Sequence, residues 1–255
     1  MRVTILGSGT SHGVPMIGCE CAVCRSSDPR DRRTRVSALV ACDSGAHLLI
    51  DLSPDLREQA LRMRLARVDA VLLTHSHADH ILGFDEIRRF NVLMKATLPV
   101  HGDEVTLRDL TRTFAYAFDP DTPRGGGIPS VSLHPVAGAF DVAGVHVVPV
   151  PILHGMRPIL GYRIGRFAYL TDCSAIPDAS YALLEGLDVL VIGALRHRPH
   201  PTHFTVAEAV TAAGRIGAAR TFLTHICHDL GHAETEAALP PHVRLASDGL
   251  VVDLA

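Results

Sequence analysis

The segment HSHADH at residues 75–80 places four side chains that can bind metal ions within six consecutive positions. In an extended stretch His75 and His77 point to the same side, because side chains alternate with a period of two. A turn into a helix then directs Asp79 and His80 towards a second point. Two pairs of ligands aimed at neighbouring points suit a dinuclear site, whose metal ions lie about 3.5–4 Å apart and bridge one hydroxide. The segment therefore predicts metal-dependent hydrolysis rather than a polar surface turn.

A second group of candidate ligands is rich in sulfur. Cys19, Cys21 and Cys24 follow the pattern C-x-C-x-x-C beside a glycine, in a predicted loop at about residues 18–25. This spacing suits a metal ion better than disulfides. Three thiolates need one further ligand to complete a tetrahedral zinc site. The alternatives are three free thiols, or a redox pair, for which a single C-x-x-C would suffice.

The apolar run at 68–73 must position the histidine segment, because it ends directly at Thr74-His75. Such a short apolar run is typical of a buried strand. The sequence VLLTH at 71–75 recurs loosely as TFLTH at 221–225, so that each run delivers a Thr-His pair at its carboxyl end. We infer two similar halves that place their ligands at one shared edge.

Other elements are predicted from periodicity and from Pro and Gly positions. Segment 119–129, rich in Pro and Gly, is predicted to be a loop, either a mobile lid or a plain surface connection. The expected strands are 3–6, 36–42, 47–51, 99–101, 131–134, 145–150, 159–164, 167–170, 189–193 and 250–254, and the expected helices are 54–65, 82–90, 177–185 and 206–216.

The pattern His-x-His-x-Asp-His after a buried strand resembles the signature of the metallo-β-lactamase superfamily. The resemblance spans the chain and implies a single α/β domain over 1–255, a four-layer αββα sandwich with metals at one edge. It implies three further ligands at strand ends, which are His154 in PILHG, Asp172 in YLTD and His225 in LTH. The implied division puts His75, His77 and His154 on one metal ion and Asp79, His80 and His225 on the other, with Asp172 bridging them.

The second position of the motif separates hydrolases from the redox branch of the superfamily, which resembles His-x-Glu-x-Asp. Here that position is His77. Neutral imidazoles suit hydrolysis with zinc or manganese, so we expect two divalent ions, Mn or Zn, in the active site.

The opening segment at 6–24 closely resembles the branch that includes phosphoribosyl 1,2-cyclic phosphate phosphodiesterases. In that branch the cysteines hold a structural zinc with a late histidine, which implies His228 in THICH as the fourth ligand. The glycines at 7, 9 and 13 do not meet the dinucleotide-binding fingerprint. They favour a tight loop near the substrate phosphate, with His12 the best further candidate to line the pocket.

A leaving alkoxide needs a proton, which a positioned histidine can supply. The resemblance to these phosphodiesterases and to ribonuclease Z implies His203 in HFT for this role, with Thr205 a good helix N-cap. His200 and His197 are the fallbacks, and Asp79 is counted as catalytic as well as ligating.

Composition limits the partners. The chain has 255 residues, 47% apolar and 20% charged, and a net charge of −3. The absence of a basic excess argues against gripping a long nucleic acid, so a nucleotide or an RNA end is the most nucleic acid we expect it to bind. No apolar run reaches membrane-spanning length, and the opening residues enter a strand without a signal peptide. A cytoplasmic protein without a membrane partner is therefore the default, and a homodimer is the candidate assembly.

The expected function is a metal-dependent phosphodiesterase that opens a small cyclic phosphate ester by attack of metal-bound hydroxide on phosphorus. One alternative is ribonuclease Z-like hydrolysis of RNA, which would share the metals and His203. Another is thioester or lactone hydrolysis at the same dinuclear site. A binding-only role is the fourth reading, since a cofactor-biosynthesis protein of the superfamily also carries a Cys-rich zinc loop.

Overall fold

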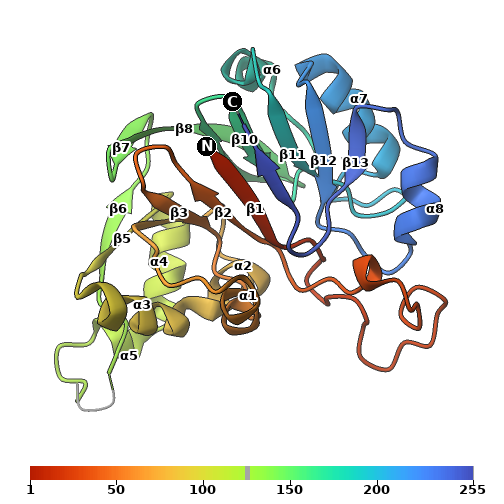
Figure 1. Cartoon of the computed structure of the whole chain (residues 1–255). Helices are drawn as coiled ribbons and strands as arrows, with labels where there is room; N and C mark the ends of the chain where they lie inside the picture. Colours follow the sequence, from red (N-terminus) through yellow and green to blue (C-terminus); the bar gives the residue numbers. More distant parts are fainter. Residues whose placement is uncertain (124–126, 255) are drawn as a thin grey trace.

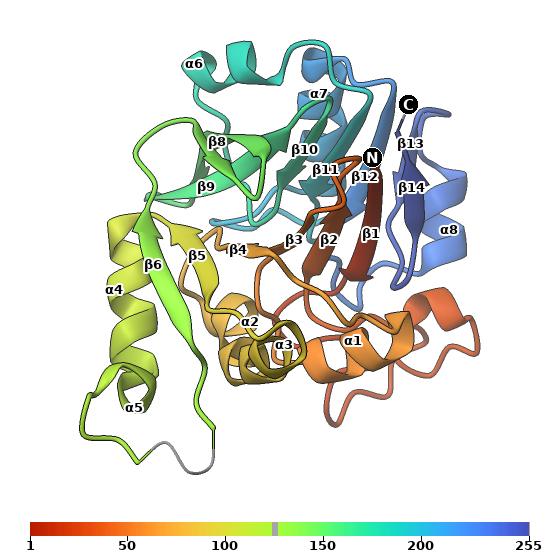
Figure 2. The same cartoon turned by 60° about the vertical axis from the view of Figure 1, so that its left-hand side comes forward.

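Two β-sheets lie face to face between two layers of helices (Figures 1 and 2). The structure, a computed structural model, describes residues 1–123 and 127–254. Apolar side chains from both sheets form the central core, among them Leu48 on one sheet and Tyr162 on the other. Each outer face packs against its own helices through a separate apolar cluster. This is the αββα sandwich predicted from the sequence.

Each sheet contains seven strands in the described part of the chain. The first has the order β14-β1-β2-β3-β4-β5-β6, with bounds β14 Val251–Asp253, β1 Arg2–Gly7, β2 Ser37–Ala41, β3 His47–Ile50, β4 Ala70–Leu72, β5 Leu98–Gly102 and β6 Val131–Pro135. The second has the order β13-β12-β11-β10-β9-β8-β7, with bounds β13 Val243–Leu245, β12 Arg220–Thr224, β11 Val189–Gly193, β10 Phe167–Leu170, β9 Arg157–Ile164, β8 Val145–His154 and β7 Phe140–Val142.

The two strands that carry the repeated Thr-His pair occupy equivalent places. Strand β4 lies between β3 and β5 and is parallel to both, and β12 lies in the same way between β11 and β13. Parallel strands bring their carboxyl ends to one edge of a sheet. The topology therefore delivers ligands from both halves to a common edge.

Helices cover both outer faces, α1 to α5 on the first sheet and α6 to α8 on the second. Their bounds are α1 Leu56–Met63, α2 Ala78–Ile81, α3 Ile87–Met94, α4 Glu104–Thr113, α5 Ala115–Phe118, α6 Asp178–Tyr181, α7 Val206–Ile216 and α8 His232–Ala237. Helix α7 begins where expected, because Thr205 and Glu208 form a reciprocal capping box. Its end is set by Gly217, whose φ of +74° suits glycine.

Several elements differ from the sequence prediction. The helix expected at 82–90 starts as a 3-10 turn at Leu82–Glu86 and becomes α-helical only in α3. Helix α4 was not predicted, although Asp103 caps it by accepting a hydrogen bond from the Thr106 amide. Residues 124–126 of the proposed lid lie outside the described residues, so the lid stays a prediction. No helix among the described residues is long and apolar enough to span a membrane.

Candidate metal centre

Every candidate ligand lies at or just beyond the end of a strand, or in the short helix that follows one. His75 and His77 follow β4, and α2 then carries Asp79 and His80. The other three ligands come from the second sheet, His154 as the last residue of β8, Asp172 after β10 and His225 after β12. Three strands of the second sheet and one strand of the first thus supply the site. This arrangement agrees with the sequence prediction that both halves place ligands at one shared edge.

Backbone conformation directs several of these side chains. Asp51, Asp172 and His225 have φ angles of 61°, 56° and 58°, in the left-handed region that residues other than glycine rarely adopt. Each follows the end of a strand, where a positive φ turns the chain and swings its side chain towards the site. Such strain persists where the surrounding structure enforces it, and it is concentrated at functional sites.

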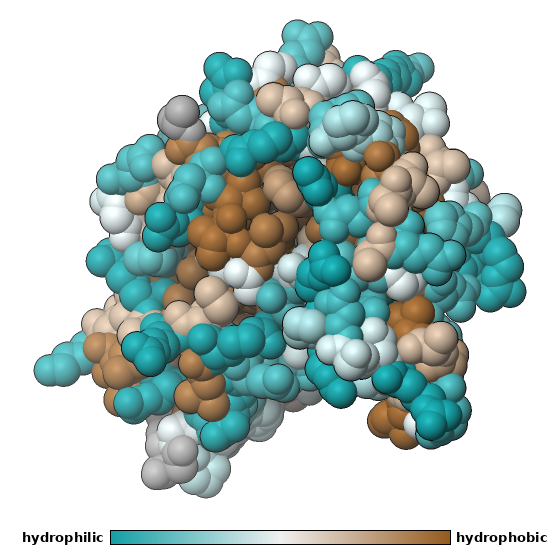
Figure 3. Space-filling view, turned by 45° about the vertical axis from the view of Figure 1, so that its right-hand side comes forward, coloured by the Kyte–Doolittle hydropathy of each residue, from teal (hydrophilic) through white to brown (hydrophobic). Residues whose placement is uncertain are grey.

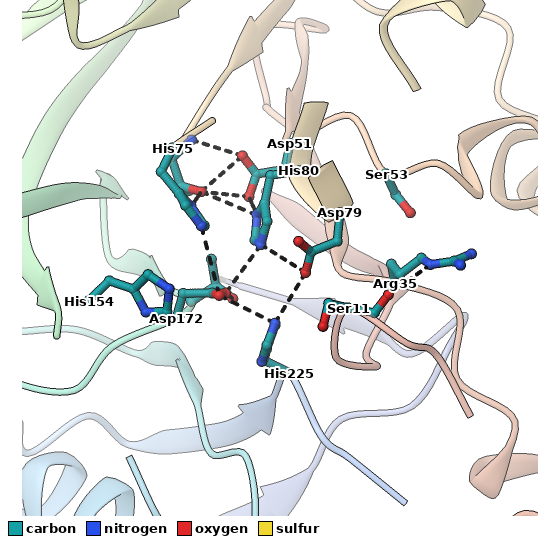
Figure 4. Close-up of polar contacts among 12 residues, drawn as sticks. Ser11, Arg35, Asp51, Ser53, His75, Asp79, His80, His154, Asp172 and His225 are labelled. Carbon is teal, nitrogen blue, oxygen red and sulfur yellow. Dashed lines mark hydrogen bonds and ion pairs between the residues drawn. The ribbon is translucent and has the colours of Figure 1, made fainter. Parts of the chain in front are cut away.

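Asp79, His80, Asp172 and His225 form one compact group, in which ligand atoms lie within 4.8 Å of one another. Figure 4 shows these side chains converging on Asp172. The Nε2 atoms of His80 and His225 each lie 3.4 Å from Asp79 Oδ2, and 3.3 Å from an oxygen of Asp172. Tetrahedral zinc with bonds of about 2.0–2.1 Å requires ligand separations of about 3.4 Å. The group therefore fits a metal ion.

His75, His77, His154 and Asp172 form the other group within the same 4.8 Å limit. His75 Nε2 lies 3.9 Å from Asp172 Oδ2 and is buried without a hydrogen-bond partner. A buried ring nitrogen with no partner is costly, and a metal ion would satisfy it. Asp172 belongs to both groups, and its Oδ1 faces His80 while its Oδ2 faces His225. The structure thus brings together the seven residues in the division expected from the sequence.

Charges at this centre favour a cation. Burial by itself would lower the pKa of His80, but the neighbouring carboxylates of Asp172, Asp51 and Asp79 raise it well above its usual value. Burial would likewise raise the pKa of Asp172, but His225 and His80 hold it well below the usual range. Three carboxylates around one imidazole leave a negative potential that a divalent ion would neutralise.

Asp51 is a site residue that the sequence analysis did not identify. It is fully buried and lies 2.7 Å from His80 Nδ1. It also accepts hydrogen bonds from Thr74 N at 2.8 Å and Thr74 Oγ1 at 2.8 Å. Thr74 Oγ1 in turn lies 3.1 Å from His75 Nδ1. One carboxylate therefore orients a histidine in each ligand group, a role typical of partners behind metal ligands. Its place at a strand end was the signal available in the sequence.

His203 lies against the ligands. Its ring stacks on His225 with centroids 4.7 Å apart, and its Nδ1 is 3.9 Å from Asp172 Oδ2. Burial, together with the nearby His225, lowers the pKa of His203 to about 3, so its ring is neutral near pH 7. Of the two fallback residues, His200 has its ring 5.0 Å from that of His203, whereas His197 is exposed.

The sulfur-rich group also assembles. Cys19, Cys21 and Cys24 place their Sγ atoms 3.1, 3.5 and 3.6 Å from His228 Nδ1. For zinc with Zn–S of about 2.3 Å and Zn–N of about 2.0 Å, a tetrahedral site requires S···N separations of about 3.5 Å. These four residues therefore fit a zinc ion, and Cys227 between the two histidines is not one of them.

A cavity of about 370 Å³ opens beside His203, and Thr10, His12, Arg196, Arg198, His200 and Asp229 are among its lining residues. All six of these residues are polar or charged. On the face in Figure 3 hydrophilic side chains likewise predominate, and apolar ones gather in a few patches. The cavity suits a polar ligand. His203 lies between the cavity and the two groups of candidate metal ligands.

A family model described as a β-lactamase superfamily domain matches residues 46–226 of this chain. The chain belongs to the β-lactamase superfamily. The match contains all seven candidate ligands of the dinuclear site, whereas the sulfur-rich loop and His228 lie outside it. With this family and the ligand groups above, the chain is a hydrolase of the metallo-β-lactamase fold, a fold that implies divalent metal ions.

Several proteins and solved structures resemble this chain. A crystal structure of a diphosphatase from the PhnP family is 48% identical, covers 100% of this chain and 98% of its own, and superposes with a TM-score of 0.92. An octanoyltransferase of Porphyromonas gingivalis is 40% identical over 252 residues, but the chain spans only 51% of that protein. Coenzyme PQQ synthesis protein B of Methylobacterium radiotolerans is 39% identical over 216 residues, 75% of this chain and 72% of that protein.

Proposed function

We propose that this superfamily member is a metal-dependent phosphodiesterase whose substrate is a small, cyclic phosphate ester. The observation that carries the proposal is the place of His203, between the two metal-ligand groups and a cavity lined by basic side chains. A phosphate held at the metals would have His203 beside its leaving oxygen and the cavity beside its organic group.

The proposed ligands of the two ions are the residues of the two groups described above. When bound, two divalent ions, Mn or Zn, supply Lewis acidity and lower the pKa of the attacking water. Asp172 would be shared by both ions, because its Oδ2 lies 3.3 Å from His225 Nε2 of one group and 3.9 Å from His75 Nε2 of the other. Asp51 and Thr74 keep the rings of His80 and His75 in place. We further propose that Cys19, Cys21, Cys24 and His228 hold a structural zinc.

His203 is the proposed general acid. Its neutral ring must gain a proton before it can give one to the leaving oxygen. A bound phosphodiester is an anion, and a negative charge within a few ångströms raises the pKa of an imidazole. The proposal requires that His203 take up a proton with the substrate, and Asp172 Oδ2, 3.9 Å from its Nδ1, would favour the protonated ring.

Arg196 supports an anionic substrate. Its guanidinium donates to the backbone carbonyls of Arg198 and Pro199, both at 3.2 Å, which hold it at the cavity wall. None of the ion pairs among the described residues involves it, whereas Arg198 is paired with Asp229 at 2.9 Å. A half-buried arginine held in this way is ready to bind a phosphate oxygen.

Hydrolysis of a diphosphate linkage is the second candidate, favoured by the 48% identical diphosphatase. It would use the same ions and the same acid, because only the leaving group differs. The octanoyltransferase gives no comparable support for acyl transfer, since its name describes a protein about twice as long as the matched part. A ribonuclease Z-like role is disfavoured by the net charge of −3.

The test is turnover by metal-stripped protein reloaded with Mn or Zn. The substrates are bis(p-nitrophenyl) phosphate, a 2′,3′-cyclic nucleotide and diadenosine diphosphate. Asp172→Ala should abolish turnover, whereas Asp141→Ala, an exposed residue of β7, should not. Preference for the cyclic ester supports the first candidate, and preference for the diphosphate supports the second. No turnover with both ions bound would reject both and make thioesters and lactones the next substrates.

A further inference from the structure

Three segments enclose the cavity beside His203, and all three meet near the sulfur-rich cluster of Cys19, Cys21, Cys24 and His228. The segments are residues 10–16, 195–203 and 227–229. His228 is at once a member of the cluster and part of the cavity wall. The cluster therefore lies directly behind the space that the substrate is proposed to fill.

Segment 227–229 is fixed without help from the cluster. Cys227 N donates to the Leu195 carbonyl at 3.1 Å, and Thr10 N donates to the Ile226 carbonyl at 3.2 Å. The buried guanidinium of Arg33 donates to the Cys227 carbonyl at 2.9 Å. These bonds hold this wall against the other two segments whether or not the cluster contains a metal ion.

The wall formed by Met16 has no such support. Residues 15–28 contain no helix or strand, and the last pairing before them is the bridge between Val14 and Arg33. Met16 N instead donates to Cys24 Sγ at 3.3 Å. The contacts of the three thiols with His228 then join this loop to the fixed segment 227–229.

A cation is needed to keep that junction closed. The three thiols and the imidazole lie within 4.8 Å of one another, but without an ion only weak hydrogen bonds of sulfur join them, whereas a zinc ion would bind all four at once. If the ion is lost, the loop at 16–24 loses its attachment and Met16 leaves the cavity wall. Loss of this ion leaves the candidate ligands of the dinuclear site in place, because their strands and hydrogen-bond partners do not involve the cluster.

We infer that the cluster at Cys19, Cys21, Cys24 and His228 shapes the substrate cavity, so that the ion it holds governs substrate binding rather than the chemical step. This inference rests on the proposed function, because it takes the cavity to be the substrate's. It assigns the cluster a role in specificity beyond holding the fold together.

The test compares a small and a large ligand in Cys21→Ser, with Cys42→Ser, a cysteine remote from the cavity, as the matched control. Inorganic phosphate needs only the dinuclear site, whereas AMP also needs the cavity. Metal content is measured by elemental analysis and both affinities by calorimetry. Cys21→Ser should lose one metal equivalent and keep its phosphate affinity. It should bind AMP about tenfold more weakly, the effect of about one lost contact. Its KM for bis(p-nitrophenyl) phosphate should rise with kcat little changed.

Met16→Ala removes the side chain at the cavity wall without changing any candidate metal ligand. If Cys21→Ser does not fold, this variant tests the inference in its place. It should weaken AMP binding with all metals present. Unchanged AMP affinity in the variant that lost the ion, or in Met16→Ala, would overturn the inference. So would equal losses for phosphate and AMP, or a wild-type protein that binds AMP no more tightly than phosphate. Absence of phosphodiester turnover by the wild type would reject the proposed function, while these binding comparisons would still decide the role of the cluster.

Discussion

Replacing Asp51 by Asn tests whether one buried carboxylate organises both halves of the metal centre. The side chain is fully buried and faces three donors, Thr74 N–H, the Thr74 hydroxyl and His80 Nδ1–H. The two carboxylate oxygens can accept all three bonds. Asparagine keeps the shape but has a single acceptor oxygen and adds two N–H donors, so at least one donor must lose its acceptor.

The expected cost follows from that count. A buried donor left without an acceptor costs about 1–3 kcal/mol. Because the affected donors hold His80 and, through Thr74, His75, the cost falls on the metal-binding geometry. The affinity for at least one active-site ion should therefore fall roughly 10–100-fold, the range expected when a partner behind a ligating histidine is lost.

The assay titrates Zn²⁺ into metal-stripped protein against a chromophoric chelator. Asp248→Asn is the matched control, since Asp248 is also a buried carboxylate that accepts bonds from backbone and hydroxyl donors, those of Ser8 and Thr34. It should lose stability and keep metal affinity. A folded Asp51→Asn protein that binds both active-site ions as tightly as the wild type would refute the reasoning.

Three further predictions concern other parts of the chain. His203→Ala should lower turnover of diesters with poor leaving groups by about 10²–10⁴-fold and that of nitrophenyl esters much less; equal losses would contradict the general-acid role. Arg196→Gln should raise the KM for anionic diesters and make that KM less dependent on ionic strength. An unchanged KM would show that Arg196 does not contact the substrate. Burial, and then His134, lowers the pKa of His101 to about 4, below its value of about 6.5 in the unfolded chain. The unfolded state therefore binds more protons between those values, and stability falls as pH decreases through that window. His101→Phe should reduce this loss in urea unfolding at pH 7 and pH 5, whereas an identical pH dependence would show that His101 titrates normally.

The structure agrees with the sequence prediction most closely where the candidate functional residues lie in short segments with a local pattern. The four candidate ligands at 75–80 lie within six consecutive positions, and those at 154, 172 and 225 each lie at or just beyond the end of an apolar strand that periodicity identifies. The capping box of Thr205 and Glu208 is likewise local. Where the sequence was less informative, as at 82–90, the choice between a 3-10 turn and an α-helix depended on packing that no local pattern records.

By itself, the sequence identified the candidate ligands and the strands that deliver them, because ligand type and strand periodicity are local properties of the chain. Only the tertiary structure decided which residues hydrogen-bond to those candidate ligands and which segments form the cavity wall beside them. Asp51 meets His80 across 29 positions of sequence, and the cavity wall joins segments from both ends of the chain. Such contacts depend on the positive φ angles at strand ends and on how two sheets pack, and these are set by the whole fold rather than by any one segment.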